Sequence, residues 1–343
     1  MSSDQAEEIN PREGQASGFG HGFVPRWWLR SPDLQTIASQ FLPRGIVLPE
    51  AEERLFRVEE GVQVRCLCHW LPDAPRRMTV LIVHGLEGSS ESVYVLGSTQ
   101  KALAAGMNVV RMNVRNCGGT EALSPTLYHS GLSADIGVVV RALISERSLE
   151  RLALVGFSMG GNLVLKLAGE WGREAPPQLK AVATVCPSIE LAASADALHR
   201  LRNRLYEQYF LVKLKRRMRR KARLFPEVFR GMSLARLRSI RDFDDKVTAH
   251  YCGFEGAADY YARASSLKVL ERIAVPTFIL HAKDDPFILL LPRTRKAISC
   301  NPHIRLIETK YGGHCGFIAE PDGYDGRWAE QQVIEFISRV DIG

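Results

Sequence analysis

The stretch LALVGFSMGGNLVLKLAG, residues 152–169, decides the fold of this chain. Its first residues form an apolar, strand-like run, and an apolar pattern with helical spacing follows the paired glycines. The centre of the stretch, GFSMG at 156–160, fits the spacing G-x-S-x-G. It fits neither the G-x-G-x-x-G of a dinucleotide-binding loop nor a phosphate-binding loop, in which a lysine follows the glycines. The pattern predicts a serine nucleophile on a sharp turn between a strand and a helix.

The glycines of this motif have a steric reason. When Ser158 stands above a sheet on such a turn, the residues two before and two after it come too close for side chains. Gly156 and Gly160 suit these positions because they lack a Cβ atom. The helix that follows presents free backbone N–H groups, and we assign the N–H of Met159 as one donor to an oxyanion.

A serine hydroxyl needs a base before it becomes a good nucleophile. In folds with this turn the chain order is serine, acid, histidine. The motifs HAKDDPF and YGGHCGF each end a predicted strand, so Asp284, Asp285 and His314 fall at the same sheet edge as Ser158. We interpret His314 as the base. Asp285 is favoured as its acid because it directly precedes Pro286, and Asp284 is the alternative; the other acid is expected to cap the turn.

A second oxyanion donor is expected from the loop VHGLEGSSES at 83–92, which follows the first predicted parallel strand. We assign it to the backbone N–H of Leu86. His84 and Gly85 are interpreted as supporting residues, with His84 bracing the loop through hydrogen bonds. The seven cysteines form no Cys-x-x-Cys pair and no Cys/His spacing typical of metal sites. No metal and no organic cofactor are therefore expected.

Buried apolar runs alternate with helical patterns along the chain, which indicates a mostly parallel sheet with helices on both faces. After a hairpin at 53–70, strands are predicted at 78–85, 107–114, 151–157, 180–187, 275–286 and 303–314. Helices are predicted at 93–105, 133–147, 159–172 and 327–340. This pattern predicts an α/β protein with a mostly parallel sheet and a helical cap inserted late in the sheet.

The chain divides by composition into a core and two additions. We predict a flexible segment at 1–22, a first part of the core at 23–187 with an N-terminal arm at 23–48, a helical cap or lid at 188–267 and a second part of the core at 268–343. The tryptophans of the arm, Trp27 and Trp28, are interpreted as packing anchors.

The predicted cap is strongly basic. Between residues 200 and 223 there are eleven Lys and Arg residues and one acid, Glu207, in a chain of net charge +7. We favour a lid helix whose apolar stripe covers the pocket. The alternative is a helix on an anionic membrane, with an apolar face that consists of Phe210, Leu211, Leu214 and Met218 directed at lipid. Nucleic acid is not expected because aromatic residues do not interleave with the charges, and no obligate protein partner is predicted.

Several motifs together resemble the YheT-like branch of the α/β-hydrolase superfamily, from about Phe23 to Phe336. They are HGLEGSSESVY, VRNCGGTEALSPTLYHSG, GFSMGGN, YYARASS, HAKDDPF and YGGHCGF. The branch includes bacterial esterases, yeast medium-chain alcohol acyltransferases and animal lipid hydrolases. This resemblance implies an α/β-hydrolase fold of about eight strands and a triad of Ser158, Asp285 and His314.

The sequence departs from one pattern of that branch. Some members carry a His-x4-Asp sequence that is discussed as an acyltransferase signature. Here Ala134 stands where the acid would fall after His129, and Asp135 comes one position late. We therefore interpret His129 as a structural residue.

These features predict a serine hydrolase that cleaves small-molecule carboxylic esters of short to medium acyl length. The alternatives are acyl transfer to an alcohol, or lipase activity on monoacylglycerol or phospholipid, with the same triad; a non-enzymatic binding module is a minor alternative. No signal-peptide core and no apolar run of membrane-spanning length occur in the sequence. A cytoplasmic location is expected.

Overall fold

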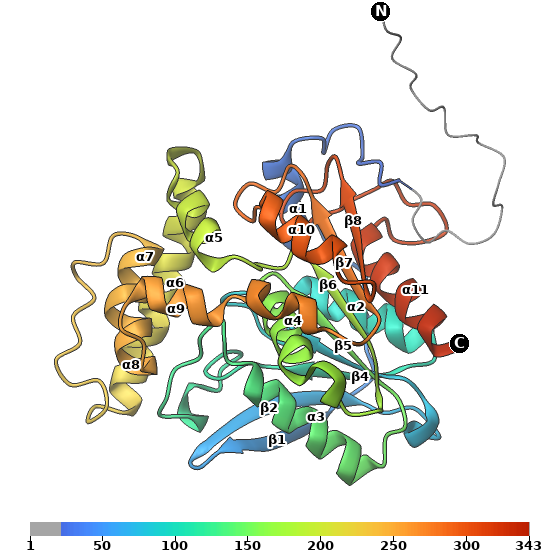
Figure 1. The fold of residues 1–343 in the computed structure, drawn as a ribbon, viewed down its shortest axis with the longest axis horizontal. Coiled ribbons are helices and arrows are strands. Elements are labelled where there is room, and N and C mark those ends of the chain that lie inside the picture. Colours follow the sequence, from blue (N-terminus) through green and yellow to red (C-terminus); the bar gives the residue numbers. More distant parts are fainter. Residues whose placement is uncertain (1–21, 343) are drawn as a thin grey trace, which may run out of the picture.

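The computed structural model describes residues 22–342, and its centre is one eight-stranded sheet (Figure 1). The prediction of a flexible segment at 1–22 falls, except for Gly22, outside the described residues. The strands are β1 (Glu52–Glu59), β2 (Val62–His69), β3 (Thr79–Val83), β4 (Asn108–Met112), β5 (Leu152–Phe157), β6 (Leu179–Val185), β7 (Thr277–Ala282) and β8 (Ile304–Thr309). Their spatial order is β1-β2-β4-β3-β5-β6-β7-β8. The pairs β1–β2 and β2–β4 are antiparallel, and the other pairs are parallel.

Helices cover both faces of the sheet (Figure 1). They are α1 (Pro32–Phe41), α2 (Val93–Ala104), α3 (Ser133–Arg147), α4 (Met159–Trp171), α5 (Leu191–His199), α6 (Arg204–Leu224), α7 (Ile240–Phe243), α8 (His250–Cys252), α9 (Ala257–Ala264), α10 (Pro292–Ser299) and α11 (Trp328–Ile342). Helices α3, α4 and α10 pack in the apolar core on one face, and α2 and α11 pack in the core on the other. No helix within residues 22–342 is long and apolar enough to cross a membrane.

The central strands are buried on both faces, which explains their continuous apolar sequence. Every residue of β3 and β5 is buried, and the two strands pair in parallel with Val83 opposite Gly156. The predicted α/β-hydrolase fold is confirmed. Several predicted strands extend beyond the observed ladders at their carboxyl ends, because the residues after Val83 and Ala282 turn away into loops.

The segment between β6 and β7 forms a helical layer to the left of the sheet in Figure 1. Within it, α6 buries Leu211, Leu214 and Met218 in an apolar cluster with Phe229 and Phe243. These side chains belong to the face that the membrane interpretation directs at lipid. That interpretation of the face is wrong, because its side chains form the interior of the cap.

The N-terminal arm is held by polar groups. Trp27 is 77% exposed and Trp28 is 43% exposed, so the interpretation of both as packing anchors is wrong. Instead, the buried amide of Gln35 on α1 donates hydrogen bonds to the carbonyls of Leu29 and Ile318 and accepts one from the N–H of Ile318. These bonds fix the arm to the loop after β8.

Asn162 connects the first turn of α4 to the cap. Its buried side chain donates to the carbonyl oxygens of Ser130, at 2.7 Å, and Ala264, at 2.9 Å. It also accepts a hydrogen bond from the N–H of Ser266 at 2.8 Å. One amide therefore satisfies buried backbone groups from two distant segments.

We predict that Asn162→Leu lowers the free energy of unfolding by about 2–4 kcal/mol, because it leaves these buried backbone groups without partners. Urea unfolding followed by circular dichroism measures the change. The matched control is Gln208→Leu on α6, whose partly exposed amide makes one bond of 3.3 Å to the Arg238 carbonyl. We expect the control to change stability by less than about 0.5 kcal/mol; equal effects of the two variants would contradict the role of Asn162.

Candidate active site

The turn between β5 and α4 places Ser158 in an unusual backbone conformation. Its φ is 53° and its ψ is −117°, a region that residues other than glycine rarely adopt. The N–H of Ser158 donates to the carbonyl of Val185 at 2.9 Å, and the carbonyl of Ser158 accepts from the N–H of Asn162 at 3.1 Å. The neighbouring backbone thus holds a conformation that would be costly in isolation.

The two glycines of the motif lie where the backbone comes closest to itself. A Cβ atom on Gly156 would lie 2.4 Å from the carbonyl oxygen of Gly160. A Cβ atom on Gly160 would lie 2.3 Å from the carbonyl oxygen of Val83 on the adjacent strand. Neither position has room for a side chain, and this crowding is the physical basis of the G-x-S-x-G spacing.

Three side chains meet at the carboxyl edge of the sheet. Ser158 Oγ lies 2.9 Å from His314 Nε2, and His314 Nδ1 lies 2.7 Å from Asp285 Oδ2. The other carboxylate oxygen of Asp285 accepts hydrogen bonds from the N–H groups of Phe287, at 3.1 Å, and Ile288, at 2.8 Å. The structure therefore brings Ser158, His314 and Asp285 into one continuous chain of hydrogen bonds.

Asp284 and Asp285 have different partners although they are adjacent. Asp285 is buried and contacts the His314 imidazole. Asp284 points to the backbone instead, and its Oδ1 accepts a hydrogen bond from the N–H of Gly313 at 2.9 Å. In this arrangement Asp285 orients the imidazole, while Asp284 holds the loop that carries it.

Burial and pairing act in opposite directions on the two ionisable groups. Burial disfavours the charged form of each side chain, but the contact between His314 and Asp285 outweighs it. The pKa of Asp285 is lowered from 3.8 as a result, and the pKa of His314 is raised from its ordinary value of 6.5. The pair therefore favours a carboxylate next to an imidazole that readily accepts a proton.

The loop of His314 rests on the N-terminal arm. The N–H of His314 donates to Thr36 Oγ on α1 at 2.8 Å. Gly313 has a φ of 57°, and a Cβ atom there would lie 2.4 Å from the carbonyl oxygen of Pro32. Sequence reasoning did not identify Thr36, because nothing local in the arm indicates a contact 278 residues away.

The loop after β3 lies directly beside Ser158. A Cβ atom on Gly85 would lie 3.2 Å from Ser158 Cβ, and the N–H of Gly85 donates to the Tyr94 hydroxyl at 2.9 Å. Within residues 22–342, the backbone N–H groups of Leu86 and Met159 donate to no protein acceptor. Both residues line the space around Ser158. The two amides assigned from the sequence are thus free to bind an oxyanion.

His84 holds this loop and is already engaged on both ring nitrogens. Its Nδ1 donates to the carbonyl of Gly85 at 2.8 Å, and its Nε2 accepts from the N–H of Val114 at 3.2 Å. Burial lowers the pKa of His84 to about 4, so the ring is neutral near pH 7. This geometry fits a bracing residue and leaves no nitrogen free to act on a substrate.

A buried ion pair joins the same loop to the cap. Glu87 has a φ of 55°, and its carboxylate pairs with Arg217 of α6; the two side chains are 8% and 9% exposed. The Tyr128 hydroxyl also donates to Glu87 Oε1 at 2.8 Å, and Lys213 of α6 donates to the Glu87 carbonyl at 3.3 Å. Two cations of the cap, Arg217 and Lys213, therefore hold the loop after β3, and sequence reasoning missed both contacts.

His129 and Asp135 do not form a pair. Asp135 accepts two hydrogen bonds from the Arg115 guanidinium, at 2.5 and 2.6 Å. His129 accepts a hydrogen bond from the N–H of Gly131 at 3.2 Å, and its ring packs edge-on against Tyr260. Neither residue therefore positions the other for acid–base work.

Two groups of possible metal ligands lie around His314. They are Cys186, His314 and Cys315, and Cys186, His281 and Asp285. Each group includes a member of the hydrogen-bonded chain, whose nitrogen or oxygen atoms already bond within that chain. Burial also raises the pKa of the Cys186 thiol, which disfavours the thiolate that a metal requires. These donor atoms therefore suit the hydrogen bonds among Ser158, His314 and Asp285 better than a cation.

Within residues 22–342, Ser158 lines two separate spaces. The cap cavity, of about 100 Å³, lies between Ser158 and the cap helices and extends to Asp244, Tyr260 and Tyr261. The groove, of about 500 Å³, lies between α1 and α6. Its walls include Ile37, Phe41, Leu205, Phe210 and Phe287.

Comparison with known proteins agrees with the fold. The family model of the alpha/beta hydrolase fold matches residues 79–321. "Putative esterase YheT" of Escherichia coli (strain K12) is 32% identical over 322 residues, which cover 92% of this chain and 93% of the relative. "Phospholipase ABHD3" of Bos taurus is 30% identical over 93% of this chain and 76% of its own length.

A solved structure shows the same fold at low sequence identity. The 2,6-dihydroxy-pseudo-oxynicotine hydrolase has a TM-score of 0.58 and 18% identity, over 90% of this chain and 72% of its own. The family match covers most of the chain and includes Ser158, Asp285 and His314. This chain belongs to the α/β-hydrolase fold family.

Proposed function

We propose that the chain hydrolyses carboxylic esters of short to medium acyl length, through an acyl-enzyme on Ser158. Its family and its relatives make ester hydrolysis the general reaction. The observation that carries the finer proposal is the continuous chain of hydrogen bonds from Ser158 Oγ through His314 to Asp285, beside two unpartnered backbone amides. Nucleophile, base, orienting acid and oxyanion donors are thus adjacent.

In the first half of the reaction, Ser158 Oγ attacks the ester carbonyl carbon. His314 Nε2 accepts the hydroxyl proton. The Asp285 carboxylate stabilises the resulting imidazolium through its hydrogen bond with His314 Nδ1. The N–H groups of Leu86 and Met159 stabilise the negative charge that develops on the carbonyl oxygen. The carbon–oxygen bond to the alcohol then breaks, and His314 gives its proton to the leaving alkoxide.

In the second half, water attacks the acyl group on Ser158. His314 accepts a proton from this water and then returns it to Ser158 Oγ as the tetrahedral intermediate collapses. The carboxylic acid leaves and the enzyme is restored. The apolar walls of the groove, with Ile37, Phe41 and Phe210, suit the acyl chain.

We predict that Ser158→Ala lowers kcat for p-nitrophenyl acyl esters by at least about 10⁴-fold and abolishes labelling by a fluorophosphonate probe. Gel fluorescence and spectrophotometric turnover measure both effects. Ser299→Ala, on the exposed end of α10, is the matched control and should behave as wild type. Labelling or turnover that persists in Ser158→Ala would overturn the assignment.

The pH dependence of kcat/KM tests the His314–Asp285 pair. Only neutral His314 accepts the Ser158 proton, and Asp285 raises the pKa of His314 above 6.5. Activity should therefore rise with pH through a midpoint above 6.5. Asp285→Asn removes the carboxylate, so the midpoint should move to lower pH while kcat falls by about 10³–10⁴-fold.

The adjacent Asp284→Asn is the matched control for this experiment. The asparagine can still accept the hydrogen bond from Gly313, so we expect no measurable shift of the midpoint. A shift in Asp284→Asn with none in Asp285→Asn would show that the pair has been assigned to the wrong aspartate.

The Glu87–Arg217 pair generates a further prediction. Arg217→Met leaves the buried Glu87 carboxylate without its cation, so the loop that carries Leu86 loses its position. We expect kcat per labelled site to fall about 10–100-fold with a smaller change in KM, and Glu87→Gln combined with Arg217→Met to restore part of it. Arg216→Met, at the adjacent exposed position, is the control; steady-state kinetics that do not distinguish the two arginines would contradict this role.

A further inference from the structure

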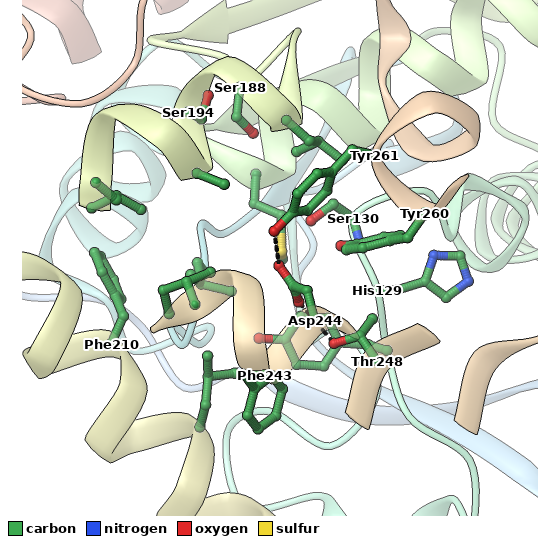
Figure 2. A pocket seen from close by; sticks show the side chains of 18 of the residues that line it. His129, Ser130, Ser188, Ser194, Phe210, Phe243, Asp244, Thr248, Tyr260 and Tyr261 are labelled. Atoms are coloured by element: carbon green, nitrogen blue, oxygen red, sulfur yellow. Dashed lines mark hydrogen bonds between the residues drawn. The ribbon is translucent and has the colours of Figure 1, made fainter. Parts of the chain in front are cut away.

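The cap cavity contains a carboxylate that the proposed reaction does not use. Ser158 and Asp244 both line this cavity, together with apolar side chains that include Leu191, Phe243 and Ile288. Figure 2 shows the Asp244 side chain directed toward Tyr261 and Thr248. Asp244 begins a π-helical turn, Asp244–Ala249, and such turns often occur at functional sites.

Two hydroxyl groups hold the Asp244 carboxylate in place. The Tyr261 hydroxyl donates to Oδ2 at 2.8 Å, and the Thr248 hydroxyl donates to Oδ1 at 2.8 Å (Figure 2). A carboxylate has about four acceptor sites, so each oxygen keeps capacity for another donor. The carboxylate is oriented by its neighbours but is not saturated by them.

No cation pairs with Asp244 within the part of the chain that the structure describes. Arg217 also lines the cavity, but it is paired with Glu87. Arg241 lies over the Tyr261 ring at 5.3 Å and forms its ion pair with Asp196. Burial raises the pKa of Asp244 to about 6, so the group is mainly ionised at pH 7 and above. Asp244 is partly buried, and a carboxylate in such a place without a cation is stabilised by a donor that enters the cavity.

Ser188 supplies a second, independent polar group to the same cavity. It is 5% exposed, and its hydroxyl has no hydrogen-bond partner within residues 22–342. It follows β6 and lines the cavity with Ser158. This hydroxyl is therefore free to bond to a polar atom that enters the cavity.

We propose that Asp244 and Ser188 form a recognition subsite for an ester whose alcohol half carries a further hydroxyl group. One hydroxyl of such an alcohol half can donate to Asp244 and another can accept from Ser188, whereas an ammonium group can only donate. The cap cavity, at about 100 Å³, suits the compact polar half, and the groove, at about 500 Å³, suits the acyl chain. This assignment rests on the proposed ester hydrolysis at Ser158.

A pair of esters that share an acyl chain tests the subsite. Glycerol monooctanoate carries two free hydroxyls on its alcohol half, and propyl octanoate carries none. In Asp244→Leu, kcat/KM for the glycerol ester should fall about 10–100-fold, while kcat/KM for the propyl ester stays within about 3-fold of wild type. Asp244→Asn should show a smaller loss in the same direction, because the amide oxygen still accepts a hydrogen bond.

The control variant removes a carboxylate elsewhere in the cap. Asp196→Asn changes the net charge as Asp244→Asn does, but Asp196 is exposed and does not line the cavity. Asp196→Asn should leave kcat/KM unchanged for both esters. If kcat/KM in Asp244→Leu falls equally for the two esters, Asp244 has a structural role and the proposal is overturned. If kcat/KM is unchanged for both esters, the proposal is overturned as well. A selective loss of an aminopropyl ester, with the glycerol ester unaffected, would overturn the hydroxyl assignment.

A binding measurement separates this subsite from the catalytic proposal. Ser158→Ala protein is titrated by calorimetry with glycerol monooctyl ether and with octyl propyl ether, neither of which can be hydrolysed. The glycerol ether should bind about 10-fold more tightly, and this preference should disappear when Asp244→Leu is added. If Ser158→Ala prefers the glycerol ether but still hydrolyses esters at the wild-type rate, the catalytic proposal fails and the subsite stands. If Ser158→Ala binds the two ethers equally, the subsite proposal fails.

Discussion

The sharp turn at Ser158, between β5 and α4, is the constraint on which the rest of the site depends. Ser158 has a φ of 53°, and it lies between the end of β5 and the start of α4. The backbone of Val83 passes so close to Gly160 that no side chain fits there, and this packing holds the turn in its strained conformation. That crowding lifts Oγ above the sheet edge where β7 and β8 also end. Asp285 and His314 can therefore reach Ser158 from the loops that follow those two strands.

Segments far from the corner complete the geometry. The arm holds the loop of His314 through Thr36, and the cap holds the loop after β3 through the Arg217–Glu87 pair. Burying a charged pair costs desolvation, so its value here lies in fixing a position more than in added stability. Ser158, Asp285 and His314 thus follow strands of the sheet, while the loops around them are held by residues from two peripheral parts of the chain.

Local rules explain how much could be predicted from the sequence. Buried parallel strands appear as continuous apolar runs, and the close approach at Gly156 and Gly160 leaves a fixed glycine spacing, so the fold and the position of Ser158 were accessible. The choice between Asp284 and Asp285 depends on side-chain direction, which adjacent identical residues do not reveal. The exposure of Trp27 and the bond from His314 to Thr36 depend on long-range packing, and no local pattern indicates either.

The most direct measurement is to locate the acyl group on the enzyme during turnover. Wild-type protein would be mixed with a p-nitrophenyl ester, quenched in acid within the first turnovers, digested and examined by peptide mass spectrometry. The account predicts the acyl mass on the peptide that contains Ser158, and on that side chain after fragmentation. An acyl group on another residue, or turnover through an enzyme that never becomes acylated, would contradict it.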